Sequence, residues 1–162
     1  MSSQITIGCV VIDLATGFEG TVTARNELFN GNLQFAVQPK ATKSSEKLPD
    51  SFSFDAISLK FKDKGISEHA IKPQATDIEV GDEVEDIISG HKGIAIMKAT
   101  FLNGCIYFDV VKKGDEAEKI ESSSMFLSAS RLKRITSKAV TPISTAGQKP
   151  TGGPTTRALR AN

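Results

Sequence analysis

Residues 5–37 read ITIGCVVIDLATGFEGTVTARNELFNGNLQFAV, and residues 78–110 read IEVGDEVEDIISGHKGIAIMKATFLNGCIYFDV. The two stretches align without a gap, and the alignment continues until Lys60 falls on Lys133. The identical positions concentrate on glycines, on Asn-Gly dipeptides and on apolar residues of the core type. At such positions backbone geometry and packing restrict the choice of residue most strongly. The sequence therefore contains two copies of one small unit.

Each copy has the composition of β structure. Residues 5–13 are rich in β-branched side chains, as expected for a strand. Residues 33–37 and the matched residues 106–110 alternate apolar with polar or small side chains, which predicts strands with one buried face. The Asn-Gly pairs favour tight type I′ hairpins, because both residues accept positive φ. We assign eight residues to structural turns: Gly17, Gly20, Asn30, Gly31, Gly90, Gly93, Asn103 and Gly104.

This pattern predicts an all-β chain of two tandem SH3-like small barrels followed by an extended C-terminal arm. The expected boundaries are residues 1–61 for barrel 1, 62–76 for the linker, 77–135 for barrel 2 and 136–162 for a basic arm. A domain of this size buries only about 60% of the surface that its unfolded chain exposes. Packing of the two barrels on each other is therefore favoured.

Composition excludes several classes of protein. Two Cys and two His cannot build a disulfide framework or a structural zinc cluster. No apolar run approaches the roughly 20 residues that a membrane-spanning helix needs. The N-terminal residues MSSQI lack the basic start and apolar core of a secretory signal. We expect a soluble intracellular protein or a part of an assembly, with no membrane partner.

The character of the sequence changes after Ile135. Residues 136–162 are rich in Ser, Thr, Gly and Pro and show no periodicity. From Arg131 onward there are seven basic residues and no acidic one, whereas residues 1–130 are net acidic. We expect an arm that becomes ordered on a partner surface, and a solubilising end without a partner is the alternative. The basic residues expected to contact the partner are Lys138, Lys149, Arg157 and Arg160.

No catalytic, cofactor-binding or metal-binding constellation stands out, so we expect no enzymatic activity, cofactor or metal. Asp13 and Asp86 recur at matched positions, which is compatible with a paired carboxylate site. Each of them also precedes a turn, where Asp accepts hydrogen bonds from backbone N–H groups. This structural interpretation is favoured. The Gly-x-x-Gly pairs lack the Lys-Ser/Thr and the helix of a phosphate loop.

Histidines and cysteines give no stronger signal. His69 and His91 are expected at the surface. Cys9 and Cys105 fall at positions that do not match in the two copies, so they are not a repeated ligand pair. Each is expected to be a small buried or edge hydrophobe, with an intersubunit disulfide left open.

Nucleic acid is a weaker candidate ligand. Four aromatic residues could stack on bases if they were exposed, namely Phe18, Phe29, Phe101 and Tyr107. The barrels are net acidic, however, whereas a surface that tracks phosphates is basic. We therefore expect that nucleic acid is not the main ligand.

The first copy contains VxDxxTGFxGxVTAR at residues 11–25 and NGxxQFxVxP at residues 30–39. This resembles a small family of tailed-bacteriophage proteins, usually single units, with the pattern GDxVxDxxTGFxG followed by TAR, by LNGC and by a closing Phe-Asp segment. The first copy keeps TGFxG, TAR and Phe54-Asp55. The second copy keeps Gly81-Asp82-x-Val84-x-Asp86 and Leu102-Asn103-Gly104-Cys105. The resemblance covers about residues 5–135 and does not include the arm.

The resemblance implies an SH3-like fold and a place among virion structural proteins, and it brings no catalytic residues. The favoured role is a capsid decoration or cement protein that binds neighbouring head subunits through its barrels and its arm. Expected partners are the major capsid protein or other virion proteins, and further copies of itself. The expected location is the virion, assembled in the host cytoplasm. Two alternatives stay open: a neck, tail or baseplate component, and a small regulatory protein that binds nucleic acid or polymerase.

Overall fold

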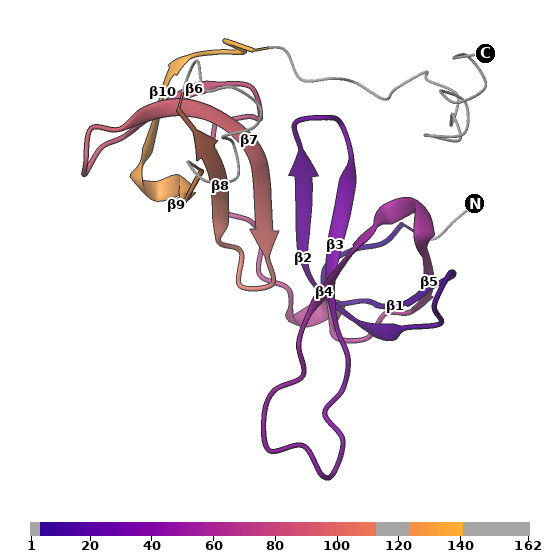
Figure 1. The fold of residues 1–162 in the computed structure, drawn as a ribbon. Coiled ribbons are helices and arrows are strands. Elements are labelled where there is room, and N and C mark those ends of the chain that lie inside the picture. The colour runs from indigo at the N-terminus through magenta and orange to yellow at the C-terminus, as the bar shows by residue number, and fades with distance from the viewer. Residues whose placement is uncertain (1–3, 113–123, 141–162) are drawn as a thin grey trace, which may run out of the picture.

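A computed structural model describes residues 4–112 and 124–140 of the chain (Figure 1). Within these ranges the regular structure consists of ten strands and three single-turn 3-10 helices, which confirms the predicted all-β class. The first half contains β1 (Val10–Asp13), β2 (Glu19–Leu28), β3 (Leu33–Gln38), β4 (Phe52–Asp55), η1 (Ala56–Ser58) and β5 (Leu59–Asp63). After η2 (Ser67–His69), the second half contains β6 (Glu83–Asp86), β7 (Lys92–Phe101), β8 (Ile106–Val111), β9 (Met125–Ser128), η4 (Ala129–Arg131) and β10 (Leu132–Thr136). No helix in this part of the chain is long and apolar enough to cross a membrane.

We call residues 4–63 unit 1 and residues 77–140 unit 2. In unit 1 the antiparallel pairing follows the path β5-β1-β2-β3-β4. In unit 2 the path β10-β6-β7-β8-β9 repeats it. This is the strand order of an SH3-like barrel, but no ladder joins β4 to β5, or β9 to β10, among the described residues. Each unit is therefore a curled open sheet, and the predicted barrel is not closed in either unit.

The structure reproduces the repeat seen in the sequence. When Asp13 at the end of β1 is aligned with Asp86 at the end of β6, the bounds of β2, β3, β4, η1 and β5 coincide with those of β7, β8, β9, η4 and β10. No insertion or deletion separates the two units anywhere between β1 and β10.

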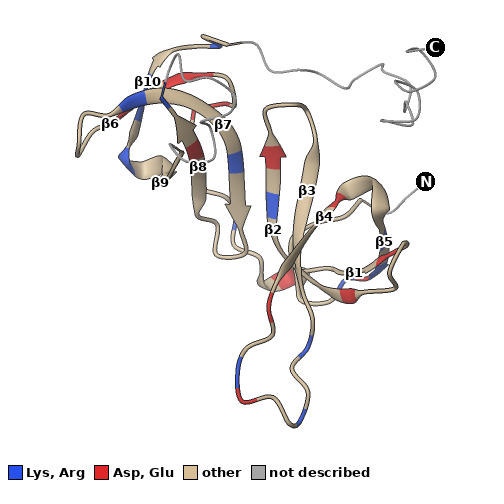
Figure 2. Ribbon diagram, viewed as in Figure 1, with Lys and Arg blue, Asp and Glu red and all other residues tan. Residues whose placement is uncertain are grey.

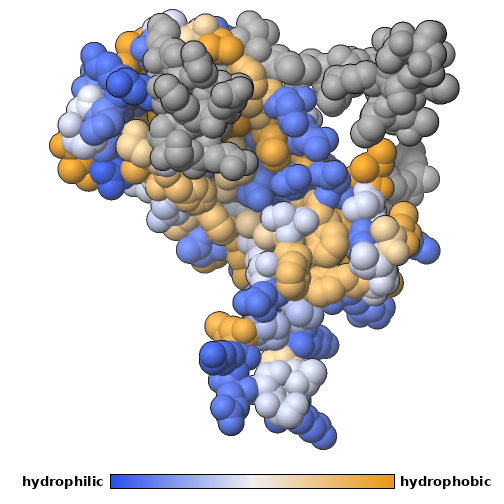
Figure 3. Space-filling view, viewed as in Figure 1, coloured by the Kyte–Doolittle hydropathy of each residue, from blue (hydrophilic) through white to orange (hydrophobic). Residues whose placement is uncertain are grey.

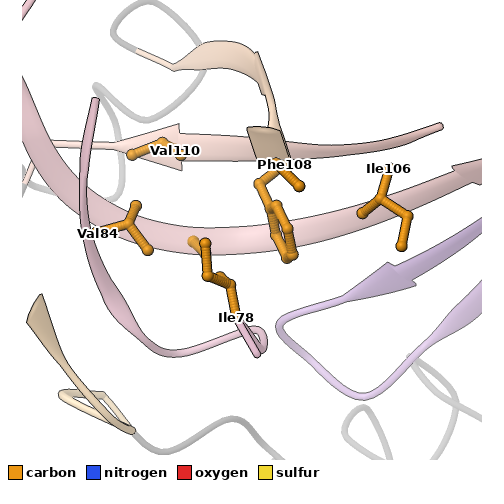
Figure 4. Close-up of a cluster of buried hydrophobic side chains, with 7 residues drawn as sticks. Ile78, Val84, Ile106, Phe108 and Val110 are labelled. Carbon is orange, nitrogen blue, oxygen red and sulfur yellow. The ribbon is translucent and has the colours of Figure 1, made fainter. Parts of the chain in front are cut away.

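Each unit buries its own apolar core at matched positions. The core of unit 1 includes Val11, Val22, Phe35, Val37 and Leu59. The matched residues of unit 2 are Val84, Ala95, Phe108, Val110 and Leu132. Figure 4 shows three residues of β8 pointing from one strand face toward Ile78 and Val84. This one-sided burial follows from the period of two in an extended strand.

The two units are joined edge to edge by β2 and β7. The second half of each strand pairs with the other strand in antiparallel register, with Ala24 opposite Phe101 and Leu28 opposite Met97. In the repeat alignment Ala24 matches Met97 and Leu28 matches Phe101, so the register is symmetric. The paired segment therefore has a local two-fold axis at its centre.

Backbone hydrogen bonds at the two ends of this seam obey the same symmetry. The N–H of Phe29 donates to the carbonyl of Ile96 (2.7 Å), and the N–H of Leu102 donates to the carbonyl of Thr23 (3.1 Å). These two bonds exchange when each residue is replaced by its match in the other unit. The result is a continuous sheet in the order β4-β3-β2-β7-β8-β9, with the starts of β2 and β7 pointing away from each other (Figure 1).

The hairpins after β2 and β7 differ from the predicted type I′ turns. Neither Asn30 nor Asn103 has positive φ, whereas Gly31 has φ 84°. The N–H of Gly31 donates to the carbonyl of Leu28 (3.0 Å), and the N–H of Leu28 donates to the carbonyl of Asn32 (2.9 Å). This is a type I turn followed by a left-handed glycine, the usual three-residue hairpin loop. The hairpin of unit 2 repeats these bonds, with Gly104 at φ 82°.

Two of the glycines predicted in turns lie inside strands instead. Gly17 and Gly90 lie in turns with φ 74° and 78°, as expected. Gly20 and Gly93 instead lie inside β2 and β7. A Cβ atom on Gly20 would lie 2.6 Å from the carbonyl oxygen of Gln38, because β3 passes very close there. The absence of a side chain at these two sites permits that close approach.

The boundaries between segments also differ from the prediction. β5 extends to Asp63, two residues into the predicted linker. At the other end β10 runs to Thr136, and the N–H of Val140 donates to the carbonyl of Gly81 (3.0 Å). Residues 136–140 are therefore part of unit 2 and not of a free arm. The remainder of the predicted arm, residues 141–162, lies outside the described residues.

Candidate functional site

The turns that join β1 to β2 and β6 to β7 are matched surface features of the two units. We call residues 13–18 turn A and residues 86–91 turn B. Because β2 and β7 are antiparallel and pair through their second halves, the turns that precede them lie at opposite ends of the molecule (Figure 1).

Turn A is built on the carboxylate of Asp13, which is 3% exposed. Its Oδ2 accepts hydrogen bonds from the backbone N–H of Thr16 (2.9 Å) and from the Thr16 hydroxyl (2.5 Å). The N–H of Gly17 donates to the carbonyl of Asp13 (2.8 Å) and closes the turn. These bonds favour the ionised carboxylate, with the Thr16 hydroxyl contributing most, and they lower the pKa of Asp13 below its usual value.

Turn B repeats the design with an added cation. Asp86 Oδ2 accepts from the backbone N–H (3.2 Å) and the hydroxyl (2.5 Å) of Ser89. The guanidinium of Arg131 then binds both carboxylate oxygens, through Nε at 2.8 Å and Nη2 at 2.7 Å. This fork, with the Ser89 hydroxyl second in importance, holds the pKa of Asp86 far below its usual range. Asp13 and Asp86 lie in separate turns, so they do not form a paired carboxylate site.

Both turns present large aliphatic side chains to solvent. In turn A, Leu14 is 65% exposed, and its N–H donates to the carbonyl of Ser58 (2.8 Å), beside the 82% exposed Ile57. In turn B, Ile87 and Ile88 are 62% and 72% exposed. Leu14 and Ile87 occupy the same position of the repeat. Burial of these side chains against a partner would remove their apolar surface from water, which makes the two turns candidate contact sites.

Figure 3 shows apolar residues, in orange, at both lateral extremities of this face of the molecule. Leu14, Ile57, Ile87 and Ile88 are not among the functional candidates predicted from the sequence. The signal was present, since an apolar residue directly after the Asp of a polar turn occurs in both copies.

Charge does not concentrate on one face of the described structure. Figure 2 shows acidic and basic residues interspersed along both units. Part of the basic C-terminal sequence is used inside unit 2: Arg131 binds Asp86, and Arg134 contacts Asp77 at 3.5 Å. Because residues 141–162 contain three basic residues and no acidic one, the net charge of +1 leaves residues 1–140 with an excess of two negative charges. The predicted contrast between acidic barrels and a basic tail is therefore weaker than expected.

The aromatic residues considered for base stacking do not share one surface. Phe18 packs against Phe54, with ring centroids 5.3 Å apart, and also against Phe52. In unit 2, Tyr107 stacks on Phe126 at 5.1 Å, and Phe101 meets both rings edge-on. Phe29 lies at the hairpin tip of unit 1. The rings thus form separate clusters that stabilise each unit.

Cysteine and histidine contribute no cluster to the described structure. Cys9 is wholly buried, which raises the pKa of its thiol, and Cys105 is half-buried; both are free thiols. Within the described ranges no three His, Cys, Asp or Glu side chains lie close enough to hold a metal ion. His69 ends η2 and His91 closes turn B.

Of the four predicted arm residues, only Lys138 lies in the described part of the chain. Its backbone N–H donates to Oδ1 of the buried Asp82 (2.7 Å), so it belongs to unit 2. Lys149, Arg157 and Arg160 lie outside the described residues. The arm hypothesis therefore now concerns residues 141–162.

Comparison with known proteins supplies no relative for this chain. No protein-family model, no curated protein and no solved structure matches it.

Proposed function

We propose that this chain is a structural protein of a tailed-bacteriophage virion, and that it joins neighbouring copies of one head subunit as a decoration or cement protein. The observation that carries the proposal is the pair of matched turns with exposed aliphatic tips at opposite ends of a two-fold molecule. A molecule that presents an aliphatic contact at each end, with Leu14 and Ile87 at the same position of the repeat, fits a surface that offers two similar recesses. The resemblance in the first copy to tailed-phage structural proteins supports the same role.

Two matched contacts on one rigid body make binding bivalent. Once turn A is bound, turn B is held close to its own recess, so the second contact forms at high effective concentration. Overall affinity then exceeds that of either contact by roughly 10²–10⁴-fold, provided that both are reached together. The carboxylate-capped turns and the continuous sheet keep the distance between the tips fixed, which is the condition for this gain.

The first experiment asks whether the chain is a component of purified phage particles. Particles of the phage that encodes it are purified by density gradient, and the copies per particle are counted by quantitative mass spectrometry. On the order of hundreds of copies supports a head position, because head shells repeat their subunits by symmetry. A dozen or fewer places the chain in the neck, tail or baseplate, and absence from particles overturns the proposal.

Variants of the turn tips test the bivalent contact. The doubly substituted chain Leu14→Ser with Ile57→Ser, and the chain Ile87→Ser with Ile88→Ser, are each titrated onto particles assembled without the protein. Each variant should bind about 100-fold more weakly than the wild type, because one contact of two is lost. The control is Leu48→Ser, which removes an 84% exposed leucine from the β3–β4 loop and leaves both tips intact. Equal loss in the control would contradict the role of the tips.

The regulatory alternative makes a different prediction. A nucleic-acid-binding protein would shift DNA or RNA in a mobility assay, and the shift would weaken steeply with added salt. We expect no such shift at moderate salt, since residues 1–140 carry a net negative charge. A salt-sensitive shift together with absence from particles would favour the regulatory function.

A further inference from the structure

The linker between the units lies along the hairpin tip of unit 2. The N–H of Ile71 donates to the carbonyl of Leu102 (2.9 Å), and the N–H of Gln74 donates to the carbonyl of Gly104 (3.0 Å). The side-chain oxygen of Gln74 accepts from the N–H of Ile106 (3.1 Å). An extended segment therefore satisfies the outward polar groups of the β7–β8 tip, as strand addition does at a sheet edge.

The matching tip of unit 1 lacks such a segment in the described structure. The residues that match Leu102 and Gly104 are Phe29 and Gly31, and no described backbone N–H donates to either carbonyl. Beside this tip lies a hollow of about 400 Å³, lined by Gly31, Asn32 and Leu33 of unit 1. Glu79 and Val80 of unit 2 also line this hollow.

The chain after β10 begins the same path that the linker takes after β5. Gly65 has φ 49°, and the matching residue Lys138 has φ 48°; no other described non-glycine residue has positive φ. The next contact uses the matched carbonyl but a donor one residue later. The N–H of Ile66 donates to the carbonyl of Gly8 (2.8 Å), whereas the N–H of Val140, the residue after the match of Ile66, donates to the carbonyl of Gly81 (3.0 Å), Gly81 being the match of Gly8.

From these observations we propose that residues 141–148 of this chain dock on the β2–β3 hairpin tip of unit 1, as the linker docks on the β7–β8 tip of unit 2. Counted from Ile66, the linker residues that bind the tip are the fifth and the eighth, Ile71 and Gln74. Counted from Val140, the fifth and eighth residues are Thr145 and Gln148. The repeat alignment itself places Gly147 at the match of Gln74, but counting from the anchoring hydrogen bond brings a glutamine to the position whose side chain caps the tip. In the proposed register Gln148 accepts the N–H of Leu33.

The segment comes from the same molecule. Under the two-fold axis of the β2–β7 seam, the path from unit 1 to the tip of unit 2 is equivalent to the path from unit 2 to the tip of unit 1. Counted from the hydrogen bonds of Ile66 and Val140, the same number of residues bridges both paths. Val140 is bound at Gly81, next to Glu79 and Val80, which line the hollow at the tip. In Figure 1 the end of the orange segment and the β2–β3 tip both lie at the upper side.

With this segment docked, each hairpin tip would be covered by a segment that crosses over from the other unit. It would leave the residues after Gln148, which include Arg157 and Arg160, as the part of the arm that can reach a partner. The inference does not depend on the virion function and stands if that function is wrong.

Amide hydrogen exchange measured by NMR tests the docking. In the full chain the Leu33 amide should exchange about three- to tenfold more slowly than in a chain ending at Val140, since one hydrogen bond protects it. A chain ending at Pro150 is the matched control and should behave like the full chain. The substitution Gln148→Ala should speed exchange at Leu33, just as Gln74→Ala should speed it at Ile106.

Different outcomes test the docking itself, the register of the docked segment and its origin in the same molecule. Equal Leu33 exchange in the full chain and in the chain ending at Val140 would overturn the proposal. Faster exchange on truncation but not in Gln148→Ala would overturn the assigned register. A spin label on Thr151→Cys, in a Cys105→Ser background, should broaden the Leu33 amide within one labelled chain. Broadening that occurs only between different chains in a mixed sample would overturn the same-molecule assignment.

Discussion

Units 1 and 2 reach the same turn geometry with different polar partners. In unit 1, Asp13 is held by Thr16, and Ser58 stands close by; in unit 2, Arg131 occupies the position of Ser58 and binds Asp86 with two hydrogen bonds. The carboxylate is buried in both units. A buried carboxylate must have hydrogen-bond donors, but several residue types can supply them. Both units therefore need donors for the buried carboxylate, but different residues supply these donors in each unit.

A second difference concerns the buried residue that the segment after the last strand of each unit can contact. Cys9 of unit 1 matches Asp82 of unit 2, and both side chains are wholly buried. Asp82 accepts hydrogen bonds from the N–H of Glu79 (2.9 Å) and the N–H of Lys138 (2.7 Å), which fastens the segment after β10. The apolar thiol of Cys9 makes no matching carboxylate contact. A single exchange of residue type thus changes how the following segment is attached.

The largest effect should come from the matched core phenylalanines. Phe35→Ala and Phe108→Ala should each lower the free energy of unfolding by about 3–5 kcal/mol, because each side chain is at most 2% exposed. Denaturant unfolding should show one transition in both variants, since the β2–β7 seam makes one sheet of two units. Two separated transitions, with only one of them shifted, would show that the units unfold independently.

The second comparison concerns steric room at matched glycines. Gly20→Ala and Gly93→Ala place a methyl group against the carbonyls of Gln38 and Val111, and each should cost about 3 kcal/mol. Gly17→Ala is the control, because its surroundings are open and only its φ of 74° is unfavourable. It should cost about 1–2 kcal/mol. Thermal unfolding ranks the three variants, and an equal cost would contradict the close approach of the strands.

The third comparison uses acid unfolding of the two turns. The folded pKa of Asp86 lies below its unfolded value, so its contribution to stability is present above about pH 4 and is lost as the pH falls through the folded pKa. Asp86→Asn should flatten this loss of stability between about pH 4 and 2 more than Asp13→Asn does. Urea titrations at several pH values give the slopes. A larger change in Asp13→Asn would show that the Arg131 fork is not the stronger anchor.

The smallest effect should come from the left-handed residue after β10. Lys138→Gly should raise the free energy of unfolding by about 0.5 kcal/mol, because glycine adopts φ 48° without a steric penalty but loses more entropy on folding. Both variants are measured by calorimetry, with Lys133→Gly as the control. Lys133 lies in the extended strand β10, so its replacement by glycine should lower the stability. A decrease in stability for Lys138→Gly would contradict the strained conformation.

Much of the architecture could be read from the repeat because matched glycines and core residues mark where backbone and packing constraints act. Val11 and Val84, or Phe35 and Phe108, are such matched core residues. The exposed tips were harder to foresee, since Leu14 and Ile87 look like core residues in the sequence. Their exposure depends on which way a turn faces, and this depends on Ser58 and Arg131, more than forty residues away.

The sequence by itself determined that the chain is all-β, that it consists of two matched units and that Asp13 and Asp86 cap turns, since these features arise from contacts between neighbouring residues and from alternation along single strands. The tertiary structure alone decided that β2 and β7 meet about a two-fold axis, that residues up to Val140 belong to unit 2 and that both turns expose their aliphatic side chains. The physical reason is that the sequence of an edge strand does not specify which other segment pairs with its free backbone groups. Its partner is selected by the shape and hydrogen-bonding groups of surfaces that exist only after each unit has folded.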